Sequence, residues 1–127
     1  MKKQNLTMKE LTKAEEEVMQ YVWKLKKAKV ADIIEHMSSP KPAYNTVSTI
    51  IRILEQKGFV GYQKQGRGHV YFPKVAQAQY KDESMKKLIN NYFEGSFSSM
   101  VSFFMKKNDL RLSDLEQIMK DLNKNED

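Results

Sequence analysis

The chain has 127 residues and a mass of 14.9 kDa, which fits one domain or two small ones and excludes a large multidomain enzyme. Apolar residues make up 40% and charged residues 30% of the chain, as in a soluble globular protein, and no apolar run approaches the roughly 18 residues of a membrane-spanning helix. We therefore expect a cytoplasmic protein with no membrane insertion. The lack of cysteine excludes disulfides, thiolate nucleophiles and thiolate metal sites, and we expect no metal and no cofactor.

The net charge of +6 belongs to the first part of the chain. Up to Pro73 there are 13 Lys and Arg residues against 7 Asp and Glu, and after it 9 against 9. This asymmetry is typical of a segment that faces a polyanion, joined to a neutral segment that serves assembly. We predict a DNA-binding domain over residues 1–73 and a helical dimerisation domain over residues 74–127. The lysines between Lys24 and Lys29, taken alone, fit a solvated helix end equally well.

Three helices are predicted in the first part. The first begins after Thr12, which forms a capping box with Glu15. The second covers Val30 to Met37 and ends at a segment with two prolines, because a proline disfavours helical geometry in the residue before it. The third covers 43–57, and the following glycine at position 58 suits a left-handed C-terminal cap.

A β-hairpin is predicted next, with strands over 59–64 and 69–72 and a basic turn that carries Arg67. Helical patterns return in three segments, Tyr80–Phe93, Phe97–Phe104 and Leu115–Leu122, and Ser113 and Glu116 form a second capping box. The predicted fold class is therefore mainly α with a small β-hairpin: a winged helix-turn-helix domain, then a C-terminal three-helix dimerisation region.

The third helix has two distinct faces. Helical spacing places Val47, Ile50, Ile51 and Leu54 on the buried face, and Asn45, Ser48, Thr49 and Arg52 on the opposite one. Short polar side chains and one arginine suit a major groove, where they bond to base edges and phosphates. Tyr44, at the start of this stretch, is also predicted to contact DNA, and Arg67 on the hairpin would reach the flanking backbone or minor groove.

The three C-terminal helices carry more apolar surface than they can hide from one another, so a second copy of the chain is expected to cover it. The residues predicted to form this dimerisation surface are Leu88, Tyr92, Phe93, Phe97, Met100, Val101, Phe104, Leu115, Ile118, Met119 and Leu122. A self-contained helical core is the alternative.

Several stretches resemble the BlaI/MecI penicillinase-repressor family. They are the run AYNTVSTIIRILEQKGFV at 43–60, GRGHVYFP at 66–73, LTKAEEEVM at 11–19, Val22-Trp23, and Gly95-Ser96-Phe97. The likeness spans roughly residues 11 to 123. It implies a dimeric transcriptional repressor, not an enzyme, whose winged helices bind a palindromic double-stranded DNA operator. It also implies DNA contacts at Asn45, Thr46, Ser48, Thr49 and Arg52, with Arg67 in the wing.

The resemblance further implies inactivation by proteolysis in the dimerisation region, triggered by a membrane metalloprotease-receptor. The family's susceptible bond, between Asn and Phe, falls at Phe103–Phe104, where this chain has Phe in place of Asn. The neighbouring bond Ser102–Phe103 is a second candidate.

Other classes of function have less support in the sequence. Ser84 and Lys87 match the Ser-x-x-Lys motif of penicillin-recognising acyl enzymes, but neither of its companion motifs is present. His36 and His69 lie on separate predicted elements without carboxylates at ligand spacing, which does not favour a metal site. A winged-helix regulator switched by a small ligand, and a winged-helix protein-interaction module, remain as alternatives.

Overall fold

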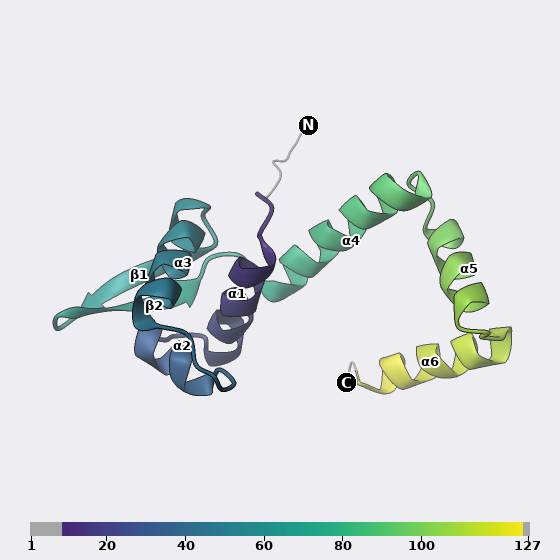
Figure 1. The fold of residues 1–127 in the computed structure, drawn as a ribbon. Coiled ribbons are helices and arrows are strands. Elements are labelled where there is room, and N and C mark those ends of the chain that lie inside the picture. Colours follow the sequence, from purple (N-terminus) through teal and green to yellow (C-terminus); the bar gives the residue numbers. More distant parts are fainter. Residues whose placement is uncertain (1–8, 126–127) are drawn as a thin grey trace. The chain divides into compact units, whose positions relative to one another are not determined.

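The computed structural model describes residues 9–125, which form helices and one antiparallel hairpin, the fold class expected from the sequence (Figure 1). In chain order the elements are α1 (Lys13–Leu25), α2 (Val30–His36), α3 (Tyr44–Gln56), β1 (Val60–Gln65), β2 (Gly68–Pro73), α4 (Gln77–Phe93), α5 (Phe97–Lys107) and α6 (Leu112–Asn125). The chain divides into two compact units between Glu83 and Ser84, inside α4. Within the described residues, no helix combines the length and the apolar character that crossing a bilayer requires.

The predicted capping box at the start of α1 is confirmed. The Glu15 backbone N–H donates to the Thr12 hydroxyl at 3.2 Å, and the Thr12 N–H donates to the Glu15 carboxylate at 3.1 Å. Two of the four backbone N–H groups that lack a partner at a helix start are thereby satisfied. Helix α1 then buries one apolar face, on which Val18, Met19 and Val22 are almost fully inaccessible.

Helix α3 begins and ends within one residue of the predicted bounds. Its inner face buries Val47, Ile51 and Leu54, whereas Ile50 is half-buried. Gly58 has φ +84°, and its N–H donates to the Glu55 carbonyl at 3.0 Å. The predicted left-handed cap is therefore present, and it turns the chain from α3 into β1.

Strands β1 and β2 pair with a register that runs from Val60 opposite Pro73 to Gln65 opposite Gly68, which leaves a two-residue turn at the tip. Gly66 supplies the positive φ (+63°) that such a turn requires. Ala28, between α1 and α2, bonds to Tyr71 through both backbone groups, at 3.0 and 2.8 Å. This bridge attaches the connection between α1 and α2 to the hairpin.

The core of the first unit lies between α1, α2, α3 and the hairpin, and its largest fully buried side chains are Phe59, Met19, Ile33, Ile51 and Leu54. The unit continues past Pro73. The Trp23 indole N–H donates to the Val75 carbonyl at 2.8 Å, and the Tyr80 ring lies 5.6 Å from the rings of both Trp23 and Phe59. The first turn of α4 therefore packs with the winged helix.

In the second unit, α5 begins after Ser96, whose hydroxyl accepts from the Ser99 N–H at 3.0 Å. The predicted capping box of Ser113 and Glu116 is wrong, because α6 begins at Leu112 and Ser113 lies inside it. The Asp114 carboxylate instead accepts from the Arg111 N–H at 3.0 Å. A short carboxylate that reaches three residues back starts the helix earlier than the serine would.

Candidate nucleic-acid interface

The outward side of α3 is polar and accessible. Tyr44, Asn45, Thr46, Thr49 and Arg52 are exposed, and Tyr44 presents 58% of its surface. Ser48, in the middle of this face, is half-buried. The face is accessible because Val47, Ile51 and Leu54 fix the opposite side of the same helix in the core.

A hollow of about 340 Å³ lies between the start of α2, helix α3 and the tip of the hairpin, and we name it the α3–hairpin hollow. Its lining residues are Lys29, Val30, Ala31, Tyr44, Ser48, Arg52, Arg67, Gly68, His69 and Tyr71. Four of the residues predicted to bind DNA therefore come together from two elements: Tyr44, Ser48, Arg52 and Arg67. The other three, Asn45, Thr46 and Thr49, lie on α3 but do not line the hollow.

The α3–hairpin hollow is basic. Lys29, Arg52 and Arg67 each come from a different element, and none of its described lining residues is acidic. The Arg52 Nε–H donates to the Ser48 carbonyl one helical turn earlier, at 3.4 Å, so the guanidinium lies along the outward face of α3. Three cations around one concave surface attract a polyanion such as a phosphate backbone.

His69 and Tyr71 line the hairpin side of the hollow, together with Arg67 and Gly68. Because β1 and β2 are in register, Tyr62, His69 and Tyr71 share one face, where the Tyr62 and His69 rings stack at 4.5 Å. Burial raises the pKa of the Tyr71 hydroxyl above its ordinary value, and the positive charge of Arg52 opposes that shift. The hydroxyl is therefore neutral at physiological pH and can donate a hydrogen bond.

Lys29, His69 and Tyr71 are lining residues that the sequence did not assign to the site. Side chains alternate between the two faces of a strand, and the two-residue turn fixes the register of the hairpin. Together these two features could have placed His69 and Tyr71 on the same face. No local pattern places Lys29 there, since its position depends on the backbone bridge between Ala28 and Tyr71.

Helix α2, which packs against α3, is stabilised by hydrogen bonds at both of its ends. At its start the Lys29 N–H donates to the Asp32 carboxylate at 2.9 Å. At its end the Lys41 ammonium donates to the carbonyls of Ile34, Glu35 and Met37, at 3.0, 2.9 and 2.7 Å. A cation there adds hydrogen bonds to the carbonyls at the end of the helix and complements the helix dipole.

The residues predicted to form the dimerisation surface differ in accessibility. Leu88, Tyr92, Phe97, Phe104, Ile118, Met119 and Leu122 are exposed, whereas Phe93, Val101 and Leu115 are half-buried. Met100 is buried inside the second unit. Ser102, Phe103 and Phe104, the predicted cleavage residues, lie on α5 and are exposed, and the Phe103 ring packs 5.6 Å from that of Phe93.

Among residues 9–125, no three His, Cys, Asp or Glu side chains are grouped as a metal site would require. His36 on α2 places its Nδ1 2.9 Å from the Asp32 carbonyl, and His69 lies on β2. The two histidines thus belong to separate elements.

The chain is similar to known proteins over most of its length. The model of the penicillinase repressor family matches residues 11–124. The methicillin resistance regulatory protein MecI of Staphylococcus aureus (strain N315) is 34% identical over 116 residues, which cover 91% of this chain and 94% of the relative. The penicillinase repressor of Bacillus licheniformis is 28% identical over 120 residues, covering 88% and 91% of the two chains.

A solved structure matches part of the chain. The solution structure of the DNA-binding domain of the repressor BlaI has a TM-score of 0.51 at 28% identity, and the match covers 58% of this chain and 92% of that chain.

Proposed function

The chain belongs to the penicillinase repressor family, and from that premise we propose that it is a transcriptional repressor that binds a palindromic DNA operator as a homodimer. The observation that carries the proposal is the α3–hairpin hollow, where three cations and the exposed polar face of α3 adjoin one another. The proposal places the protein in the cytoplasm, with its operator, and includes no catalytic step.

In this proposal α3 enters the major groove. Asn45, Ser48 and Thr49 bond to base edges or nearby phosphates, and Arg52 pairs with guanine through two hydrogen bonds. Lys29 and Arg67 line the same hollow as Arg52, at the start of α2 and the tip of the hairpin. They contact the flanking phosphates, which set the register of the helix but do not read sequence.

The test of DNA binding starts with the selection of genomic fragments that the full chain retains. Binding to the selected duplex is then followed by fluorescence anisotropy from 50 to 200 mM salt. Six or more phosphate contacts over a dimer predict an affinity loss of about 10³-fold across that range. A protein-interaction module would retain no duplex, or would bind it with little salt dependence, and either result contradicts the proposal.

Dimerisation is proposed to cover the exposed apolar side chains of α4, α5 and α6. Seven of the residues assigned to this surface are exposed, and an apolar area of that extent is rarely left to water. In sedimentation, Leu122→Glu is expected to convert a dimer into a 15 kDa monomer, since it places a charge in the apolar interface. Ser113→Glu adds the same charge on the opposite side of α6 and is expected to leave the dimer intact. A monomeric wild type at low micromolar concentration would refute the dimer.

Inactivation is proposed to follow from scission of α5 between Ser102 and Phe104 by a membrane metalloprotease-receptor of the family type. A cut there separates Phe97 from α6, and both carry part of the dimerisation surface. Because a protease needs an extended substrate, α5 must first open locally, and the exposure of its serine and phenylalanine side chains favours such opening. Purified protein that its cognate protease leaves intact between Ser102 and Met105 contradicts this step.

A further inference from the structure

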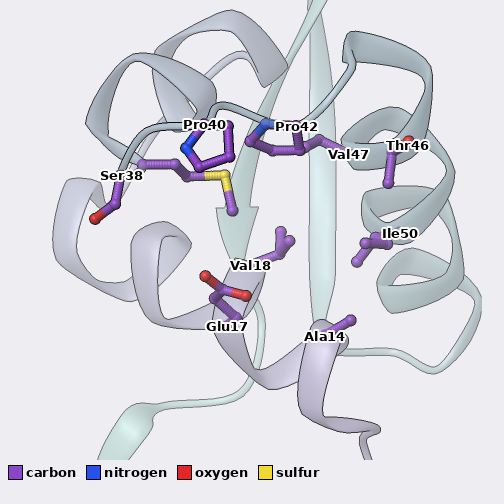
Figure 2. A pocket seen from close by; sticks show the side chains of 10 residues that line it. Ala14, Glu17, Val18, Ser38, Pro40, Pro42, Thr46, Val47 and Ile50 are labelled. Carbon is purple, nitrogen blue, oxygen red and sulfur yellow. The ribbon is translucent and has the colours of Figure 1, made fainter.

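A second hollow, of about 290 Å³, lies on another side of α3, and we name it the α1–α3 hollow (Figure 2). Helix α1 forms one wall with Val18, α3 forms the other with Val47 and Ile50, and Pro40 and Pro42 from the connection between α2 and α3 close it. The walls are mostly apolar. The volume is near the lower limit of roughly 300 Å³ for small-molecule sites, so it suits a compact ligand.

Glu17 places a negative charge at the lining of this mostly apolar hollow. It is the one charged side chain among the described residues that line the hollow, and Figure 2 shows its carboxylate on the α1 side, next to Val18. No residue in the described part of the chain makes a hydrogen bond or ion pair with this carboxylate. The neighbouring cation Lys41 is engaged elsewhere, because its ammonium bonds to three carbonyls at the end of α2.

We propose that the α1–α3 hollow binds a small organic monocation with an apolar body. The ammonium group pairs with the Glu17 carboxylate, and the body contacts Val18, Val47 and Ile50. An anion is disfavoured by the same carboxylate, and a neutral molecule of the same shape gains the apolar contacts without the ion pair.

The position of the hollow connects such a ligand with α3. Thr46 lines the hollow and is also a candidate DNA contact, and Val47 and Ile50 fix α3 against α1. A ligand in this space favours one spacing of the two helices and so changes the affinity of α3 for DNA, with the reciprocal effect of DNA on the ligand. This coupling rests on the proposed operator binding, whereas ligand binding itself does not.

The binding step is tested without DNA by titrating benzylammonium chloride into the ¹⁵N-labelled full chain and following amide resonances. We expect saturable shifts that centre on α1 and α3 around the hollow, with a dissociation constant on the order of 1 mM for so small a ligand. Benzyl alcohol is expected to bind more weakly and benzoate not at all. Glu17→Gln should weaken benzylammonium binding about two- to fivefold, the range for a partly exposed ion pair, and Glu35→Gln, an exposed charge change outside the hollow, should not.

Two results overturn the site. One is the absence of saturable shifts around the hollow, and the other is equal binding of benzylammonium and benzyl alcohol that Glu17→Gln does not alter. Ala14→Leu is a second variant: it fills the hollow from the exposed side of α1, retains Glu17, and should abolish the shifts. Shifts that persist in this variant place the ligand elsewhere and contradict the proposal.

The coupling step is tested by measuring operator affinity at constant ionic strength with and without saturating benzylammonium. A change of at least twofold in the wild type, lost in Ala14→Leu, supports it. Ligand binding without such a change overturns the coupling and leaves the site. A chain that binds no operator even without ligand contradicts the proposed function instead, so the two failures are distinguishable.

Discussion

Replacing Glu15 by Gln removes the negative charge that pairs with Lys57 and thereby links α1 to α3. Glu15 is buried, with 7% of the residue exposed, and its carboxylate accepts hydrogen bonds from the Thr12 N–H and the Lys57 ammonium. Lys57 also donates to the Glu10 carbonyl, at 2.8 Å. This ion pair therefore connects the start of α1 with the end of α3. Glutamine keeps an oxygen for Thr12 but leaves Lys57 without its anionic partner.

The size of the effect follows from the environment of the pair. A hydrogen bond to a charged group contributes about 1.5 to 3 kcal/mol. The side chains of Lys57 and Glu15 are 22% and 9% exposed, so partial solvation of Lys57 places the pair in the lower part of that range. We expect Glu15→Gln to lower the free energy of unfolding by about 2 kcal/mol. For a unit of this size the midpoint temperature falls by about 8 to 16 °C.

The assay is thermal and urea unfolding followed by the fluorescence of Trp23, the single tryptophan of the chain, which is buried on the core face of α1. Glu17→Gln is the matched control, because it makes the same change on the same helix at an exposed position without an ion pair among the described residues. The control is expected to stay within about 0.5 kcal/mol of the wild type. Equal effects of the two substitutions would refute the reasoning.

The same pair predicts a pH dependence. The hydrogen bond from Lys57 holds the pKa of Glu15 below its ordinary value of 4.5, and burial acts against that shift. A carboxyl whose pKa is lowered by folding contributes stability above its unfolded pKa and loses it as the pH falls through the folded value. The difference between wild type and Glu15→Gln is therefore expected to be complete at pH 7 and to shrink below pH 4.5. A difference that is the same at pH 7 and pH 3 contradicts this assignment.

Two further predictions address the boundary of the first unit and the wing. Tyr80→Ala removes the ring contacts with Trp23 and Phe59 and the hydrogen bond to Glu16, so it should lower the free energy of urea unfolding by about 2 to 3 kcal/mol, and Tyr80→Phe by about 1 kcal/mol. Wild-type stability in Tyr80→Ala would show that α4 is not part of the winged-helix core. Arg67→Ala should weaken binding to all duplexes and reduce the salt slope by about one for each protomer, which makes about two for the dimer, and an unchanged slope would remove Arg67 from the phosphate contacts.

The outward face of α3 was predictable because side chains repeat around a helix about every 3.6 residues, so the buried positions determine the exposed ones. Val47, Ile51 and Leu54 are buried at helical spacing, and that spacing alone assigns Asn45 and Arg52 to the other side. The hairpin was predictable because Gly66 has the positive φ that its turn demands. In both places the local chemistry and the tertiary structure agree, which is when sequence patterns are most informative.

The remaining features depend on contacts between distant parts of the chain. Lys29 lines the α3–hairpin hollow because Ala28 bonds to Tyr71, far away in sequence. Tyr80 continues the apolar spacing of α4, yet it packs on Trp23 and Phe59. At the start of α6 the sequence allows two caps, one formed by Ser113 with Glu116 and one by Asp114 with the Arg111 N–H. Both have the same three-residue spacing, so the sequence alone does not show that the Asp114 cap is the one that forms.

The central claim, that α3 reads base edges, is tested most directly by the ratio of operator affinity to random-duplex affinity in two variants. Arg52→Ala should cost about 1 to 3 kcal/mol on the operator and much less on random DNA, because it removes a base contact. Lys27→Ala, at an exposed cation between α1 and α2, should weaken both duplexes alike and leave the ratio unchanged. An equal loss on operator and random duplex for Arg52→Ala would contradict the account.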